Sequence, residues 1–201
     1  MNSCGLVLLA AGASTRLGQP KQLLPWQEKS LLQLMTETAL QSVNGLVVVV
    51  LGANAGDLQP VVDAKKVNIV YNAGWQEGIA SSIRSGLTAL LQVAPLTENV
   101  IFMVCDQPYV TPSLIKELIN VKKQTGKKIV ASKYADTTGI PVIFDKSIFP
   151  SLLKLEGNTG AKKIIQQFNG EVETIDFPLG HIDIDTKEDY DNFTKRAKAE
   201  Q

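Results

Sequence analysis

The chain has 201 residues, a hydrophobic fraction of 44% and equal numbers of acidic and basic side chains, so its formal net charge is zero. This length suits one domain with a sizeable core, and the zero net charge argues against a nucleic-acid surface that works by bulk charge. The sequence shows no signal-like N-terminal segment, no membrane-spanning apolar run and only two cysteines, too few for a disulfide framework. We therefore expect a single cytoplasmic domain over residues 1–201, without membrane or nucleic-acid partners.

Apolar runs alternate with amphipathic stretches along the chain. The expected strands are residues 4–10, 46–51, 67–71, 100–105 and 129–132, followed by 139–144 and 171–177. The expected helices are residues 30–41, 56–64, 81–92, 112–125, 145–155, 159–168 and 187–199. This alternation predicts an α/β fold with a Rossmann-like, doubly wound, mostly parallel sheet. The two later strands are expected to form a small antiparallel addition at one edge.

Three polar motifs begin where an expected strand ends. Residues 11–21 follow the first strand, residues 72–78 follow the third, and residues 106–108 follow the fourth. Ligands of such sheets bind beyond the carboxyl ends of the strands. The topology therefore predicts that all three motifs converge on one site.

The segment after the first strand has the composition of a polyphosphate site. Small residues occupy positions 10–14, and two cations, Arg16 and Lys21, follow with Gly18 between them. Small side chains let backbone N–H groups approach phosphate oxygens, while Arg supplies a planar fork of donors and Lys a mobile point charge.

Carboxylates are available near the same edge. Asp106 directly follows a strand, and Asp183 and Asp185, two residues apart, would share one face of a strand. Mg²⁺ prefers oxygen ligands and needs only one or two carboxylates when it arrives with a nucleotide. The alternative for Asp106 and for Asp185 is the capping of the helices that follow them.

Residues 6–25, LVLLAAGASTRLGQPKQLLP, resemble the signature LAAGxSxRxGxxKxLLP of the MobA-like nucleotidyltransferases. Within that class the chain is most similar to the molybdenum cofactor cytidylyltransferases. Further segments similar to the blocks of this class follow in order: NAGWQEGIASSIRSGL at 72–87, DQP at 106–108, GIPVIF at 139–144, LEGNTGAKKII at 155–165 and DIDTKED at 183–189.

The resemblance implies an Mg²⁺-dependent enzyme that moves CMP from CTP to the terminal phosphate of molybdenum-loaded molybdopterin and releases pyrophosphate. Arg16, Lys21 and Asp106 would be catalytic, with Asp106 and Asp183 as the metal ligands. A target enzyme of the xanthine dehydrogenase class is the implied partner. The implied nucleotide contacts are Ala10, Ala11, Gly12, Ala13, Ser14, Arg16, Lys21, Asn72, Gly78, Ser82 and Asp106. CTP is favoured over GTP because the loop reads LAAG rather than the LAGG of the guanylyltransferases.

The chain departs from the family pattern in the block that often reads GDxGAR. Asn158 and Lys162 stand at its acidic and arginine positions. Lys lacks the bidentate fork of Arg, so the acceptor pocket could differ. Two alternatives therefore remain open: a nucleotidyltransferase that acts on a sugar or polyol phosphate, and a non-catalytic carrier or maturation protein for the molybdenum cofactor.

Overall fold

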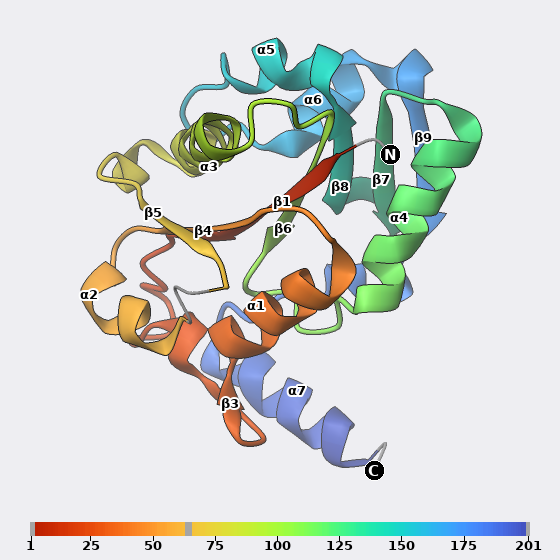
Figure 1. The fold of residues 1–201 in the computed structure, drawn as a ribbon. Coiled ribbons are helices and arrows are strands. Elements are labelled where there is room, and N and C mark those ends of the chain that lie inside the picture. The colour runs from red at the N-terminus through yellow and green to blue at the C-terminus, as the bar shows by residue number, and fades with distance from the viewer. Residues whose placement is uncertain (1–2, 63–65, 200–201) are drawn as a thin grey trace.

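The computed structural model describes residues 3–62 and 66–199. Its main element is a seven-stranded sheet with the order β5-β4-β1-β6-β8-β7-β9 (Figure 1). The strands are β1 (Cys4–Ala10), β4 (Val47–Leu51), β5 (Asn68–Tyr71), β6 (Asn99–Val104), β7 (Ile129–Tyr134), β8 (Thr137–Asp145) and β9 (Val172–Asp176). A short antiparallel hairpin of β2 (Pro25–Trp26) and β3 (Lys29–Ser30) lies outside this sheet.

Helices cover both faces of the sheet (Figure 1). One face carries α3 (Ile79–Val93), α5 (Phe149–Leu152) and α6 (Ala161–Gln167), and the other carries α1 (Leu31–Ser42) and α4 (Pro112–Thr125). The short helix α2 (Ala55–Leu58) follows β4, and α7 (Lys187–Ala199) is the last helix.

Alternation along the central strand β1 creates two cores. Leu6, Leu8 and Ala10 pack with α1 and α4, whereas Val7, Leu9 and Ala11 pack with α3, α5 and α6. Successive side chains of a strand point to opposite faces, so a strand covered on both sides is apolar throughout. Burial on both faces anchors the end of β1, from which the loop of small residues begins.

The predicted α/β architecture is confirmed, with differences in detail. β8 runs antiparallel to both of its neighbours, β6 and β7, as expected for an antiparallel addition. It lies inside the sheet, however, and β9 at the edge pairs parallel with β7, so the antiparallel expectation was wrong for residues 171–177. Residues 182–185 form no strand.

Three expected helices are shorter than predicted, and one of them is 159–168, of which α6 covers only Ala161–Gln167. The segment 145–155 contains only a 3₁₀ turn and the four-residue α5, and Pro150 lacks the N–H that would bond back to Lys146 in one continuous helix. In the segment 56–64, α2 ends at Leu58 and a 3₁₀ turn with Pro60 follows, while residues 63–64 lie outside the described part. The hairpin of β2 and β3 was not predicted.

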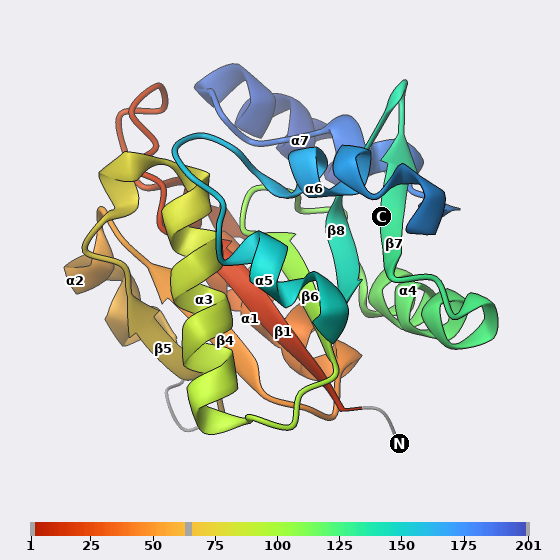
Figure 2. The same cartoon turned by 90° about the horizontal axis from the view of Figure 1, so that it is seen from above.

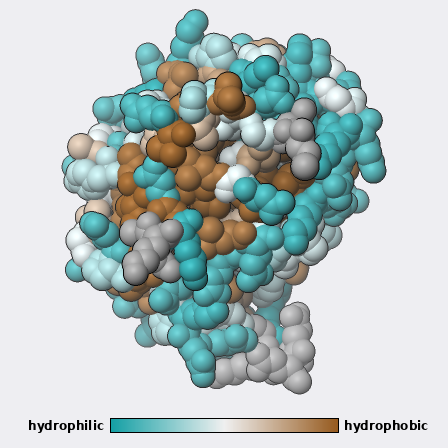
Figure 3. Space-filling view, viewed as in Figure 1, coloured by the Kyte–Doolittle hydropathy of each residue, from teal (hydrophilic) through white to brown (hydrophobic). Residues whose placement is uncertain are grey.

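The carboxyl ends of the parallel strands lie on one side of the molecule. In Figure 2 the loop after β1, in red, and α7, in blue, both lie at the edge opposite the N-terminus. Figure 3 shows the molecule from the view of Figure 1, with hydrophobic side chains gathered near its centre. No helix within residues 3–62 and 66–199 is both long and apolar enough to traverse a bilayer.

Candidate active site

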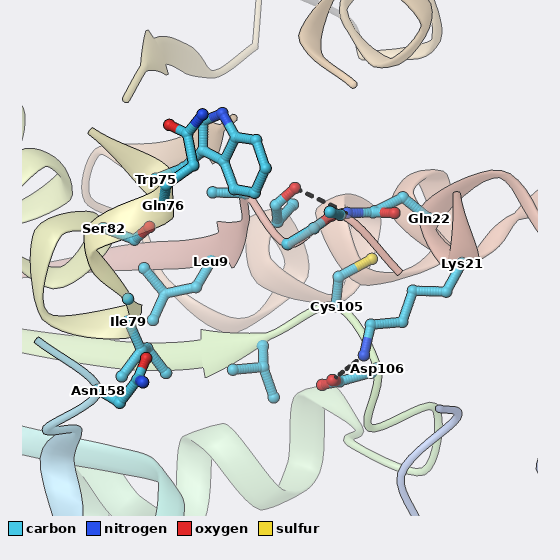
Figure 4. Close-up of a pocket in the computed structure, with 16 residues that line it drawn as sticks. Leu9, Lys21, Gln22, Trp75, Gln76, Ile79, Ser82, Cys105, Asp106 and Asn158 are labelled. Carbon is cyan, nitrogen blue, oxygen red and sulfur yellow. Dashed lines mark hydrogen bonds and ion pairs between the residues drawn. The ribbon is translucent and has the colours of Figure 1, made fainter. Parts of the chain in front are cut away.

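A cavity of about 370 Å³ lies at the carboxyl edge of the sheet (Figure 4). Its walls come from the end of β1 and the loop after it, the start of α3, the end of β6 and the loop before α6. Lysine and carboxylate groups stand at one end, and Trp75, Ser82 and Asn158 stand at the other (Figure 4). The cavity is lined by Leu9, Ala10, Ala11, Gly12, Ala13, Lys21, Gln22, Trp75, Gln76, Gly78, Ile79, Ser82, Val104, Cys105, Asp106 and Asn158.

The loop after β1 rests against the end of β4. The carbonyl oxygen of Ala11 accepts a hydrogen bond of 3.1 Å from the Ala53 N–H. A Cβ on Gly52 would lie 2.6 Å from that same oxygen, so glycine is required for this close approach. The small residues at the end of β1 and after it therefore lie close to the end of β4, and four of them line the cavity: Ala10, Ala11, Gly12 and Ala13.

Lys21 lies between two carboxylates. Its ammonium is 2.5 Å from Asp106 Oδ2 and 2.8 Å from Asp185 Oδ1. Arg16, whose side chain is 70% exposed, contacts the other oxygen of Asp185 at 2.6 Å. The backbone supports this arrangement, because the Ile184 N–H donates to the carbonyl oxygen of Asp106 at 3.0 Å. Segments separated by nearly the whole chain thus form one charged cluster.

The pKa values follow from this cluster. Burial lowers the pKa of Lys21, but Asp106 and Asp185 outweigh that effect and hold it above its ordinary value. Burial raises the pKa of Asp185, yet its bonds with Lys21 and then Arg16 hold it below the ordinary value. Asp183 behaves differently: desolvation and then the charge of Asp106 raise its pKa to about 6. Lys21 and Asp185 therefore meet as ions, whereas no ion pair joins Asp183 to a cation among the residues that the structure describes.

Both capping alternatives are wrong. Thr111 caps α4, because its side chain accepts from the Leu114 N–H. At α7, Asp189 Oδ2 accepts from the Thr186 N–H at 2.8 Å, and Thr186 Oγ1 accepts from the Asp189 N–H at 3.2 Å. Asp106 and Asp185 are thereby left to the charged cluster.

Asn72 organises the far end of the cavity from behind. Its buried amide donates to Ser81 Oγ at 2.9 Å and to Ser82 Oγ at 3.0 Å, and its carbonyl oxygen accepts from the Gly74 N–H. The hydroxyl of Ser81 donates a hydrogen bond to the Gly78 carbonyl oxygen. Within the described residues Ser82 has no acceptor for its hydroxyl hydrogen, so this hydrogen can be donated into the cavity.

Most of the predicted site residues line this cavity, and four do not. Ala10, Ala11, Gly12, Ala13, Lys21, Gly78, Ser82 and Asp106 are on its wall. Ser14 and Asn72 support the wall, Arg16 reaches it through Asp185, and Asp183 lies beyond it and lines a neighbouring hollow with His181. Sequence reasoning missed Gln22 as a wall residue. Trp75, which was also outside the predicted set, is half-buried and contributes to both core and wall.

The two departures from the family block are not a pair in space. Asn158 lines the cavity, whereas Lys162 lines a separate hollow beside Lys133 and Gln166. The exchange at Lys162 therefore leaves the cavity wall unchanged, and only Asn158 bears on it.

The donor set suits a divalent cation. Asp106 and Asp185 already converge on the one ammonium of Lys21, which shows that their oxygens can share a cation. Among the residues that the structure describes, no group of three His, Cys, Asp or Glu forms a metal cluster. Two carboxylates with the remaining positions left to water and phosphate oxygens are typical of Mg²⁺ sites.

Residues 6–172 match the model of the MobA-like NTP transferase domain. The chain belongs to this nucleotidyltransferase family. Nicotine blue oxidoreductase from Paenarthrobacter nicotinovorans is 31% identical over 179 residues, with 85% of each chain covered. Molybdenum cofactor cytidylyltransferase from Escherichia coli K12 is 21% identical over 194 residues, which cover 94% of this chain and 95% of the relative.

Solved structures share the fold. A homologue of Rv0371c from Mycobacterium sp. strain JC1 superposes with a TM-score of 0.85 at 31% identity, covering 98% of each chain. Rv0371c of Mycobacterium tuberculosis H37Rv, in a complex with manganese, has a TM-score of 0.79 at 27% identity and covers 97% of this chain and 99% of its own.

Proposed function

We propose that the protein transfers CMP from CTP to the terminal phosphate of a molybdopterin-type acceptor and releases pyrophosphate, with Mg²⁺ as the metal. The observation that carries this proposal is the convergence of Lys21 with Asp106 and Asp185 at one end of a nucleotide-sized cavity. The small-residue loop beside it offers backbone N–H groups to phosphates. The family membership and the E. coli cytidylyltransferase relative support the same reaction.

Asp106 and Asp185 would hold the metal. A divalent cation there would supply positive charge and a template for substrate oxygens. Asp183 was the sequence-based choice for the second ligand, but Asp185 is the carboxylate that shares a cation with Asp106. We therefore propose Asp185 in that role and keep Asp183 as the tested alternative.

The cations of the loop would bind the phosphates. With a metal held by the two carboxylates, the ammonium of Lys21 would contact the phosphate at which the acceptor attacks. Arg16 is exposed beside Asp185 and would contact the phosphates that leave as pyrophosphate. The acceptor phosphate is largely dianionic at neutral pH, because the second pKa of a phosphate monoester is about 6, so it needs no protein base. Catalysis then consists of positioning and charge stabilisation.

The far end of the cavity would bind the base. Ser82 can donate its hydroxyl hydrogen to an acceptor atom on the cytosine edge, since Asn72 already donates to its oxygen. The methyl group of Ala11 lines the same cavity and narrows it relative to glycine. Both features favour a pyrimidine over guanine.

The alternatives concern the acceptor and the presence of catalysis. A sugar or polyol phosphate would use the same phosphate loop, and a carrier of the molybdenum cofactor would need no nucleotide. A xanthine dehydrogenase-class enzyme would be the recipient of the cytosine dinucleotide form of the cofactor. The relative nicotine blue oxidoreductase, 31% identical, is named as an oxidoreductase, so the experiment below also tests for hydride transfer from NADH or NADPH.

The decisive experiment incubates the protein with each nucleoside triphosphate, Mg²⁺ and molybdenum-loaded molybdopterin, and identifies products by mass spectrometry. We expect the cytosine dinucleotide product with CTP and stoichiometric pyrophosphate. Parallel reactions replace the acceptor with sugar and polyol phosphates, or the nucleotide with NADH or NADPH. Product only in one of those reactions, or none in any, would contradict the proposal.

A further inference from the structure

The phosphate-binding loop is closed into a ring by one buried side chain. Gln22 is 1% exposed, and its amide nitrogen donates to the carbonyl oxygens of Ala10 and Gly12, both at 2.9 Å. Its carbonyl oxygen accepts from the hydroxyl of Ser14 at 3.3 Å. A single amide therefore contacts the end of β1 and two positions of the loop that follows it.

The ring also fixes the turn that carries Lys21. The hydroxyl oxygen of Ser14 accepts from the Lys21 N–H at 3.0 Å. Lys21 and Gln22 belong to the same 3₁₀ turn, Lys21–Leu23. The amide of Gln22 thus links the backbone of the loop to the backbone that presents the Lys21 ammonium to Asp106.

This loop has a conformation that needs such support. Ser14 has a φ of 54°, in the left-handed region that residues with a side chain rarely adopt. Apart from its two chain neighbours, no atom of the described residues lies within 4 Å of an ideal Cβ on Gly12, so side-chain packing there does not hold it in place. The hydrogen bonds of Gln22 supply the constraint that packing does not.

We propose that Gln22 is a positioning residue that sets the shape of the phosphate loop, so that its N–H groups and Lys21 face one polyphosphate. The inference rests on the proposed nucleotidyl transfer, and it concerns the phosphate half of the substrate alone. Gln22 contacts the loop at the end of the cavity where Lys21 lies, and the proposed base contacts lie at the opposite end (Figure 4).

The test measures binding of Mg-pyrophosphate and of CMP by calorimetry in Gln22→Met, which keeps the length of the side chain and removes its hydrogen bonds. We expect affinity for Mg-pyrophosphate to fall at least about tenfold, because the three side-chain hydrogen bonds that shape the anion site are lost, while CMP affinity changes less than about threefold. For the reaction with CTP, kcat should fall and KM for CTP should rise. Gln33→Met is the matched control: it removes the side-chain half of the α1 capping box, away from the cavity, and should leave both affinities unchanged.

Gln22→Glu adds a readout that simple loss of stability would not give. A carboxylate cannot donate to the two carbonyl oxygens, whereas a protonated carboxyl can donate to one of them. The Mg-pyrophosphate affinity of Gln22→Glu, taken as a ratio to wild type at each pH, should therefore recover as the pH is lowered from 8 to 6. If Gln22→Met does not fold, this variant alone decides the question.

Equal losses for pyrophosphate and CMP, or a wild-type pyrophosphate affinity in folded Gln22→Met, would overturn the inference. Likewise, a flat pH ratio for Gln22→Glu would contradict it. Failure of the proposed function looks different: wild type would then bind Mg-pyrophosphate in a Gln22-dependent manner but transfer no CMP to any acceptor.

Discussion

The ammonium of Lys21 lies 2.5 Å from the carboxylate of Asp106 and contacts Asp185 from the same position. Lys21 thereby occupies the place between two carboxylates that a divalent cation would take. A metal ion and the Lys21 ammonium would weaken each other's binding between these carboxylates, since like charges at such distances repel. Binding of the metal and release of Lys21 toward the nucleotide are thus expected to be coupled.

Lys21→Met should therefore have opposite effects on metal binding and on turnover. Without nucleotide, Mn²⁺ should bind several-fold more tightly, because the competing ammonium is gone. Turnover with CTP should fall by at least about a hundredfold, the order of magnitude for loss of one preorganised electrostatic contact. Paramagnetic resonance titration gives the first quantity and pyrophosphate release the second, with Lys29→Met as a control on a distant ion pair. Weaker metal binding in Lys21→Met would contradict the coupling.

Asp185 and Asp183 can be separated by the same titration. We expect Asp106→Asn and Asp185→Asn each to weaken Mn²⁺ binding in the presence of CTP by at least about tenfold, since each removes a charged oxygen ligand. Asp183→Asn should change it much less. The reverse order for the last two variants would restore Asp183 as the second ligand.

Asp183 should make stability depend on pH. Its pKa is raised from 3.8 to about 6 in the folded protein, so the folded state binds a proton more tightly than the unfolded chain. This carboxyl therefore lowers the free energy of unfolding as the pH rises from about 4 to 6. Because Asp183 is exposed to solvent, screening reduces the effect to ~1 kcal/mol.

Asp183→Asn should accordingly stabilise the protein at pH 7.5 by ~1 kcal/mol relative to its effect at pH 4. Urea unfolding at both pH values measures the difference. The control is Asp136→Asn, an exposed carboxylate in the turn between β7 and β8. A stabilisation that is the same at both pH values would show that Asp183 titrates normally.

Gly78 and Gly126 form a matched pair for testing the wall of the cavity. Both have positive φ, at 107° and 65°, but only a Cβ on Gly78 would meet another segment, at 2.5 Å from the Gly157 carbonyl oxygen. Gly126→Ala should cost ~1–2 kcal/mol, the penalty of the left-handed conformation. Gly78→Ala should cost more and also reduce CTP affinity, because it separates α3 from the loop that carries Asn158. Equal stability losses and unchanged CTP binding would rule out this contact as part of the site.

Base choice should respond to Ala11 and Ser82 in different ways. Ala11→Gly widens the cavity and should raise GTP use only partly, since one methyl group is worth ~1–3 kcal/mol in discrimination. Ser82→Ala removes the hydroxyl donor and should lower kcat/KM for CTP without creating a GTP enzyme. The measurement is kcat/KM for both nucleotides with one acceptor. A wild-type preference for GTP would contradict the proposed use of CTP but would remain consistent with nucleotidyl transfer.

The sequence predicted the features that depend on local pattern. The period of apolar residues located β1, α1, α3 and α4, and the position of Asp106 after a strand placed it at the cavity. The ion pair of Lys21 with Asp185 joins residues 164 apart, and no local pattern encodes such a contact. Thr186 and Asp189 form the capping pair at α7. The alternative in which Asp185 caps this helix was therefore wrong, because the cap is the residue after it.

Gln22 was missed for a related reason. A glutamine in a polar loop appears unremarkable, and only the fold shows that it is buried and faces two backbone carbonyls. Its position between Lys21 and two leucines was the available signal, because a polar residue in an apolar turn needs partners. The strand geometry expected for Asp183 and Asp185 is absent, because the Ile184 N–H bonds to the Asp106 carbonyl oxygen instead of to a neighbouring strand.

The distance between α3 and the sheet is set at Gly86, about one helical turn beyond the wall residue Ser82. A Cβ on this glycine would lie 2.8 Å from a methyl group of Val50 and closer still to Val7. Ile79 and Ser82 are part of the same helix, so any residue that lifts α3 at position 86 also moves the cavity wall. The size of nucleotide or acceptor that fits can therefore be changed by a residue that never meets it. Selection for larger substrates, in the laboratory or in nature, could therefore act on the core residue Gly86 and leave every proposed phosphate-binding residue unchanged.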